Sequence, residues 1–149
     1  MHILDQEAPG LSERLRPLSL RGRRRIVANA CKTASETIYD LDARVQYLLK
    51  LIVSDHALSE AQVAEANSLA EAADERYFDL QAQNRPKNEW LGWFFKARLL
   101  TGIAAGFGGE SWTDTADALY ELSKTRDDAS AIFALVDSDI SAASEEDVT

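Results

Sequence analysis

Apolar residues recur at helical spacing along almost the whole chain, and this pattern restricts the fold more than any other feature. Between residues 27 and 52 they form a continuous seam with steps of three or four residues: Val27, Ala30, Ala34, Ile38, Leu41, Val45, Leu48 and Ile52. Such steps place the apolar side chains on one face of a helix. No segment combines sustained alternation with β-branched residues, so we expect an all-α fold.

Capping and stop signals divide the chain into a single bundle of about five helices. The first helix is long, covering about residues 20–53, although threonine and serine cluster at residues 33–37 and leave a kink or break open there. The second ends before Pro86, because the residue that precedes a proline is biased away from helical angles. Side chains suited to capping mark the later starts: Ser59 with Gln62 as a capping box, Thr113, and Asp127 or Asp128.

The third helix, about residues 88–107, carries aromatic and aliphatic side chains around its whole circumference. A helix of this kind is surrounded by other helices, so we expect it at the centre of the bundle. Lys96 and Arg98 lie near the middle of the segment, which makes it a poor membrane span and a good buried helix. We therefore expect no membrane association.

We interpret residues 1–149 as one all-helical domain, since no internal repeat or interdomain linker is present. Residues 1–18 form an N-terminal arm ahead of the first long helix. Residues 141–149 consist mostly of serine, alanine and acidic residues, which is typical of a frayed acidic tail. Cys31 is the single cysteine, so we expect a packed, inert thiol in a reducing, cytoplasmic environment.

Charge is distributed unevenly along this chain of formal net charge −9. Residues 1–32 carry seven basic and three acidic side chains, whereas residues 33–149 carry nine basic and twenty-two acidic ones. Such asymmetry is typical of an arm or tail that docks on another surface. The acidic body repels nucleic acid and anionic membranes over most of its surface.

A basic patch at the start of the first long helix comprises Arg21, Arg23, Arg24 and Arg25. Cations are disfavoured near a helix N-terminus, so we expect negatively charged partners to offset the unfavourable interaction of these arginines with the helix dipole. One interpretation is contact with nucleic-acid phosphates, but no recognisable DNA-binding unit accompanies the patch. We favour pairing with the acidic end of the same chain or of a dimer mate: Asp137, Asp139, Glu145, Glu146 and Asp147.

The residue types needed for a metal centre or a catalytic site are scarce. One cysteine and two histidines cannot build a zinc site. Glu71-x-x-Asp74 resembles half of the paired acidic motif of all-α nucleotide pyrophosphohydrolases, but no Glu-x-x-Glu partner is present. His56 follows an aspartate in the connection between two expected helices. A nucleophilic serine at a strained turn, as in Gly-x-Ser-x-Gly, does not accompany it. We therefore expect no catalytic residue, no metal and no cofactor.

Arg98 lies toward the aromatic side of the expected central helix and requires a partner, because an isolated buried charge is costly. We expect a buried ion pair with an acid on one of the two preceding helices, such as Asp42 or Asp74. A clamp for a ligand carboxylate is the alternative. Gly102 and Gly106, four residues apart, predict a flat surface against a neighbouring helix.

The second helix offers the most suggestive exposed surface. Opposite its alanine stripe we expect a face composed of Glu60, Glu65, Glu71, Glu75, Phe78 and Asp79. An aromatic anchor among carboxylates is suited to recognising a basic partner. The alternative is a solvated acidic face, with Phe78 covered by the N-terminal segment.

The expected function is therefore that of a non-enzymatic protein-interaction domain. The size and acidity of the chain suit an inhibitor or immunity-type protein that neutralises a basic partner such as a toxin. Three alternatives stay open: a nucleic-acid-associated regulator using the arginine patch, a magnesium-dependent nucleotide hydrolase, and a structural homo-oligomer (a homo-dimer in the simplest case) that associates through the apolar seam.

Overall fold

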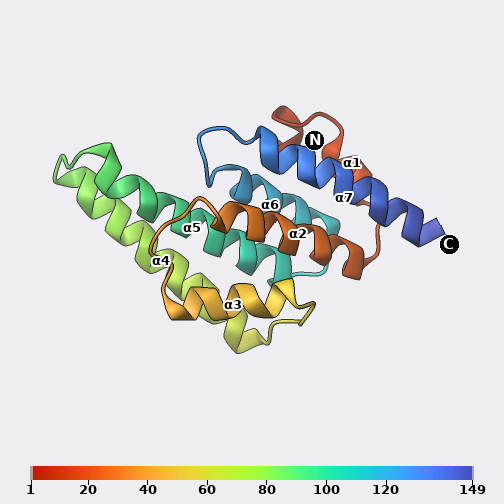
Figure 1. The fold of residues 1–149 in the computed structure, drawn as a ribbon, viewed down its shortest axis with the longest axis horizontal. Helices are drawn as coiled ribbons and strands as arrows, with labels where there is room; N and C mark the ends of the chain where they lie inside the picture. The colour runs from red at the N-terminus through yellow and green to blue at the C-terminus, as the bar shows by residue number, and fades with distance from the viewer. Residues whose placement is uncertain (1, 149) are drawn as a thin grey trace.

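A computed structural model describes residues 2–148 of the chain and the side chains of residues 2–144. Within these residues the fold is all-α with no strand, as the periodicity predicts (Figure 1). A short 3₁₀ helix, η1, precedes seven α-helices. They are η1 (Ile3–Gln6), α1 (Leu11–Leu15), α2 (Leu20–Ser35), α3 (Ala43–Val53), α4 (Glu60–Ala82), α5 (Lys87–Gly108), α6 (Trp112–Ser123) and α7 (Ser130–Val148).

The described helices outnumber the five expected because the first long helix is broken and because α1 forms within residues 1–18. At the break, the Ser35 hydroxyl donates to Lys32 O over 2.7 Å and the Thr37 hydroxyl donates to Ala34 O over 3.2 Å. Such local bonds compete with helix continuation. Asp40 then adopts a left-handed φ of 60°. The Asp42 carboxylate starts α3 by accepting from two backbone N–H groups of its first turn.

Capping boxes mark where α4 and α6 begin. Ser59 and Gln62 form the expected capping box at the start of α4. Helix α6 is capped by Ser111 instead of Thr113, because Asp114 stands three residues after Ser111 and completes a capping box with it.

Helix α7 differs from expectation at its far end. The Asp128 carboxylate accepts from Ser130 N over 2.9 Å at its start. The helix then continues to Val148, where we expected a frayed tail from residue 141. The expected irregular segment is therefore helical as far as the structure describes it.

Helix α5 packs between α4 on one side and α6 and α2 on the other (Figure 1). We call residues 97–108 its inner half and residues 87–96 its outer half. All of the buried residues of α5 belong to the inner half: Ala97, Leu99, Leu100, Gly102, Ile103, Ala104, Gly106 and Phe107. The expected central position therefore holds for the inner half alone. No helix of the described chain has the length and apolar character needed to cross a membrane.

Two glycines allow close helix packing around the inner half. A Cβ atom on Gly102 would lie 2.8 Å from Leu122 Cγ of α6. A Cβ atom on Gly106 would lie 2.7 Å from Val27 Cγ1 of α2. The absence of a side chain at these two positions is what lets α6 and α2 approach α5.

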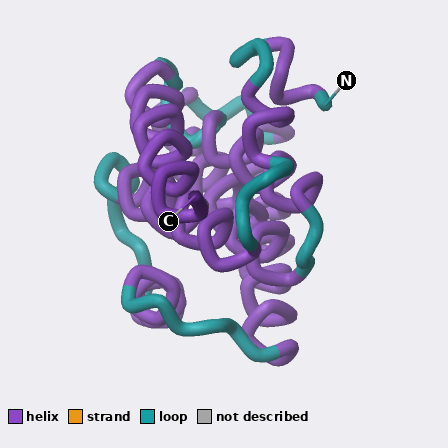
Figure 2. Tube along the Cα trace, turned by 90° about the vertical axis from the view of Figure 1, so that its right-hand side faces the viewer, coloured by secondary structure: helices purple, strands orange, loops and turns teal. Residues whose placement is uncertain are grey.

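The expected N-terminal arm is folded onto the bundle. Leu4, Leu11, Leu15 and Leu18 are buried within the common hydrophobic core. A hydrogen bond between His2 and Asp117 adds to this contact, as do ion pairs that join Glu7 to Lys124 and Arg14 to Asp137. In Figure 2 helices make up most of the trace, and loops are confined to short connections between them.

Candidate functional site

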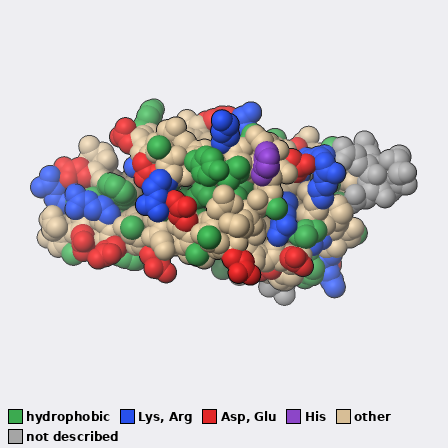
Figure 3. Space-filling model, turned by 90° about the horizontal axis from the view of Figure 1, so that it is seen from below, with side chains coloured by type: hydrophobic (Ala, Val, Ile, Leu, Met, Phe, Trp, Pro, Cys, Tyr) green, Lys and Arg blue, Asp and Glu red, His purple; other side chains and the backbone are tan. Residues whose placement is uncertain are grey.

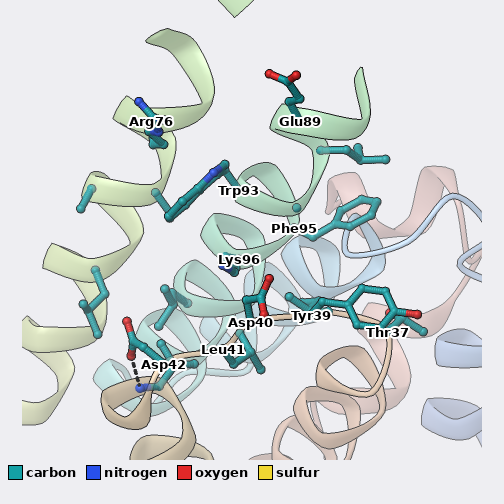
Figure 4. Close-up of a pocket in the computed structure, with 18 of the residues that line it drawn as sticks. Thr37, Tyr39, Asp40, Leu41, Asp42, Arg76, Glu89, Trp93, Phe95 and Lys96 are labelled. Atoms are coloured by element: carbon teal, nitrogen blue, oxygen red, sulfur yellow. Dashed lines mark hydrogen bonds between the residues drawn. The ribbon is translucent and has the colours of Figure 1, made fainter. Parts of the chain in front are cut away.

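The outer half of α5 lines a large open cleft. This cleft of about 960 Å³ lies between α4, the outer half of α5 and the connection formed by residues 37–42. Figure 4 shows Trp93 lying toward α4, Phe95 pointing to the other side of α5, and Tyr39 and Asp40 approaching from the connection. Tyr39 is 86% exposed. The cleft therefore has accessible aromatic walls contributed by segments that are distant in sequence.

Charged groups of both signs surround these walls. Lys96 Nζ lies 4.4 Å from the centre of the Trp93 ring, a favourable cation–π distance. Arg76 and Asp40 line the cleft without a hydrogen bond or ion pair to any other described residue. The Glu89 carboxylate accepts from Arg85 over 2.6 and 2.9 Å, and this hydrogen bonding lowers its pKa. The cleft thus combines apolar surface with uncommitted polar groups.

A cluster of aromatic rings occupies the opposite side of the α4–α5 hairpin. The Tyr77 ring lies 4.9 Å from Phe78, 5.3 Å from Trp90 and 5.2 Å from Phe94, measured between ring centres. Phe78 remains 59% exposed. The N-terminal segment packs on α6, so it does not provide the cover for Phe78 that the alternative interpretation required.

The acidic face of α4 is present but divides into two groups. Glu71, Glu75, Phe78 and Asp79 fall within nine consecutive residues, about 12 Å along the helix axis. Glu60 lies about 27 Å from Phe78 by the same measure. All four carboxylates are exposed and make no ion pair with another described residue.

Glu65, the sixth predicted member of the face, is engaged separately. Its carboxylate accepts from Arg44 Nε of α3 over 2.8 Å. Of the six predicted residues, the four nearest the tip of the hairpin lie close together, and Glu60 and Glu65 are separate from them. Figure 3 shows the lower face of the molecule, where acidic and basic side chains are interspersed around hydrophobic patches.

Arg98 lies between two carboxylates. It donates to both Asp74 oxygens, over 3.0 and 2.8 Å, and to Glu121 over 2.7 Å. Its guanidinium also lies 5.5 Å from the centre of the Phe94 ring. These contacts join α4, α5 and α6 in a partly buried network. Sequence reasoning named Asp74 but missed Glu121, which follows Arg98 by 23 residues on a different helix.

The arginine patch has partners that the sequence analysis did not identify. Arg21 pairs with Asp55 over 2.9 Å, and Arg24 donates to Gly109 O over 3.4 Å. Arg23 is buried and donates to the backbone oxygens of Leu18 and Glu110.

The expected acidic partners of the patch are engaged elsewhere or lie outside the described side chains. Asp137 pairs with Arg14. Asp139 accepts from Asn29 over 3.1 Å. The side chains of Glu145, Glu146 and Asp147 are not described.

The remaining candidates offer no reactive constellation. Among the described residues, no group of three or more His, Cys, Asp and Glu side chains could hold a metal ion. Asp74 of the half-motif is committed to Arg98. Cys31 is completely buried, and burial raises the pKa of its thiol. His56 is exposed on the connection between α3 and α4.

The apolar seam is used within the chain. Val27, Ala30, Ala34, Ile38, Val45, Leu48 and Ile52 are all buried in the hydrophobic core. A homo-oligomer would therefore need a surface other than this seam.

Comparisons with protein families, with curated proteins and with solved structures found no match.

Proposed function

We propose that this chain is a non-enzymatic protein-binding domain that captures a basic partner at the tip of the α4–α5 hairpin. Its action would be that of an acidic inhibitor or immunity-type protein, which neutralises a basic protein such as a toxin. One observation carries the proposal. Phe78 is 59% exposed beside Glu71, Glu75 and Asp79, and none of these carboxylates has a cation partner among the described residues.

The physical basis is the combination of an apolar anchor with unpaired charge. An exposed aromatic ring keeps apolar surface in contact with water, which is unfavourable. Burying the ring against a partner therefore contributes favourable binding free energy. Aromatic residues at the centre of an interface commonly contribute much of its binding free energy. Carboxylates around such an anchor attract basic partners and repel acidic ones. The formal charge of −9 extends that attraction over longer distances.

The position of the hairpin supports the same function. Figure 1 shows the ends of α4 and α5 extending beyond the neighbouring helices. The aromatic cluster around Tyr77 lies on one side of this hairpin, and the cleft containing Trp93 lies on the other. A partner that contacts both sides of the hairpin tip would bury Phe78 on one side and place a side chain between Trp93 and Tyr39 on the other.

Affinity capture from the native cell, followed by quantitative mass spectrometry, tests the proposal. We expect one stoichiometric partner of basic composition, released by raised salt. The double reversal Glu75→Lys and Asp79→Lys should reduce its recovery at least about tenfold, through the loss and inversion of charge complementarity. Phe78→Ala should have a similar effect through the lost anchor.

A matched control separates the site from net charge. Glu110→Lys with Asp127→Lys changes the total charge equally at two exposed carboxylates away from the hairpin tip. This control should retain the partner. Equal loss in both double variants, recovery of a partner that ignores all the substitutions, or recovery of no partner would contradict the proposal.

A further inference from the structure

A second cavity, of about 340 Å³, lies between the first turns of α2 and the connection from α3 to α4. Arg21 and Arg24 reach it from α2, and His56 reaches it from the connection. Leu20, Ile52 and Phe107 add apolar walls. This volume falls at the lower end of the range that small-molecule pockets occupy, roughly 300–1,000 Å³.

Arg24 has hydrogen-bonding capacity to spare. A guanidinium carries five N–H donors. The hydrogen bond that the structure gives Arg24 is a long one, 3.4 Å, from Nη2 to Gly109 O. Its side chain is partly exposed, and no second hydrogen bond joins it to another described residue. The imidazole of His56 likewise makes no hydrogen bond or ion pair to another described residue. Both side chains are therefore available to a ligand that accepts hydrogen bonds.

The charge of the cavity selects the ligand class. Its lining contains two guanidinium groups and one carboxylate, that of Asp55, which is held by Arg21. The charge of Arg24 is consequently left without a carboxylate among the described residues, in a chain that is acidic overall. A guanidinium matches the geometry of a phosphate, whose oxygens accept two parallel N–H bonds.

The start of α2 does not itself provide the recognition. Gly22 N donates to the Ser19 hydroxyl over 3.0 Å, and Arg23 N donates to Ser19 O over 2.9 Å. The connection that carries His56 is also held in place, since His56 N donates to Leu51 O over 3.0 Å. Recognition therefore rests on side chains from two separate and positioned segments.

We infer that this cavity binds a small organic phosphate, with the phosphate on Arg24 and His56 and its organic part against Leu20, Ile52 and Phe107. Arg21 would add a further contact from the rim, where it pairs with Asp55. The cavity volume accommodates a molecule the size of a sugar phosphate or one nucleotide. The inference is independent of partner capture at the α4–α5 hairpin.

Isothermal titration calorimetry on the full chain tests this inference with three probes: inorganic phosphate, adenosine monophosphate and a short single-stranded RNA. We expect one molecule of adenosine monophosphate per chain, displaced by inorganic phosphate. Arg24→Gln should weaken binding at least about tenfold, because it removes a charge-assisted hydrogen-bonded contact. Lys32→Gln, which removes one exposed charge from the same helix, should leave binding unchanged.

His56→Ala provides a second variant on an exposed connection, should Arg24→Gln fail to fold as judged by circular dichroism. It should also weaken binding of adenosine monophosphate. Absence of heat with both phosphate probes, or binding that both variants leave intact, would overturn the inference. Tighter binding of the RNA with the same dependence on Arg24 would overturn it as well, in favour of a nucleic-acid contact.

Discussion

Both halves of α5 are rich in apolar residues, but the outer half carries three charged side chains and the inner half one, and the two halves differ in what surrounds them. The inner half, residues 97–108, is enclosed by α4, α6 and α2 and contains every buried residue of the helix. The outer half, residues 87–96, carries two tryptophans and two phenylalanines, all of them partly exposed. One half builds the core, and the other presents aromatic surface to the cleft and to the hairpin tip.

This difference teaches that an apolar helix is buried only as far as its neighbours extend. Gly102 and Gly106 admit α6 and α2 to the inner half. Around Gly92 in the outer half, a Cβ atom would meet no other atom within 4 Å. We expect the inner half to determine stability and the outer half to determine binding.

Matched leucine truncations should give the largest effect and the most direct test of this division. Leu99→Ala, at a completely buried site, should lower the free energy of unfolding by about 3 kcal/mol. Leu91→Ala, at a partly exposed site in the cleft, should cost less than about 1.5 kcal/mol. Urea denaturation measures both values. Equal losses would show that the outer half is packed as tightly as the inner half.

Glycine substitutions in the same two halves should differ in sign. Gly106→Ala should destabilise by about 1–3 kcal/mol, because its new methyl group would overlap Val27 Cγ1. Gly92→Ala should stabilise by up to about 1 kcal/mol, because alanine favours the helix and open space receives its methyl group. Thermal unfolding of the two variants tests the contrast, which fails if both change stability in the same direction.

The smallest effect concerns the exposed pair that Glu89 of the outer half forms with Arg85, two residues before α5. Hydrogen bonding from Arg85 lowers the pKa of Glu89, so their contact stabilises the fold above the pKa of an unfolded glutamate, about 4.3. The contribution disappears as the pH falls through the lower pKa of the folded state. Glu89→Gln should reduce the urea midpoint slightly at neutral pH and converge with the parent chain in acid. A difference that persists in acid would assign Glu89 another role.

Local signals were sufficient for the helical class and for several helix ends. The Ser59 capping box involves residues three apart, so the sequence contains the complete interaction. Ser111 could have been chosen over Thr113 by the same spacing to Asp114. The break before α3 stayed open because threonine and serine at residues 33–37 weaken a helix without forbidding it.

The candidate surfaces depended on contacts that sequence spacing does not contain. A helical pattern placed Glu60 and Phe78 on one side of α4 but did not account for the turns that separate them. The cleft is built from the connection at residues 37–42 and from two helices, and its position depends on where α2 ends. The aromatic run of the outer half followed by Lys96 was the available signal, and we interpreted it only as core.

The packing of the N-terminal segment also constrains the order of folding. Leu4, Leu11 and Leu15 are synthesised well before α6, which ends at Ser123, yet η1 and α1 contact that helix. The contacts of these leucines' helices with α6 form only after Ser123 has been synthesised. These contacts have a high sequence separation, so they form slowly compared with helices. Helices η1 and α1 are therefore synthesised more than a hundred residues before the end of the helix that completes their packing.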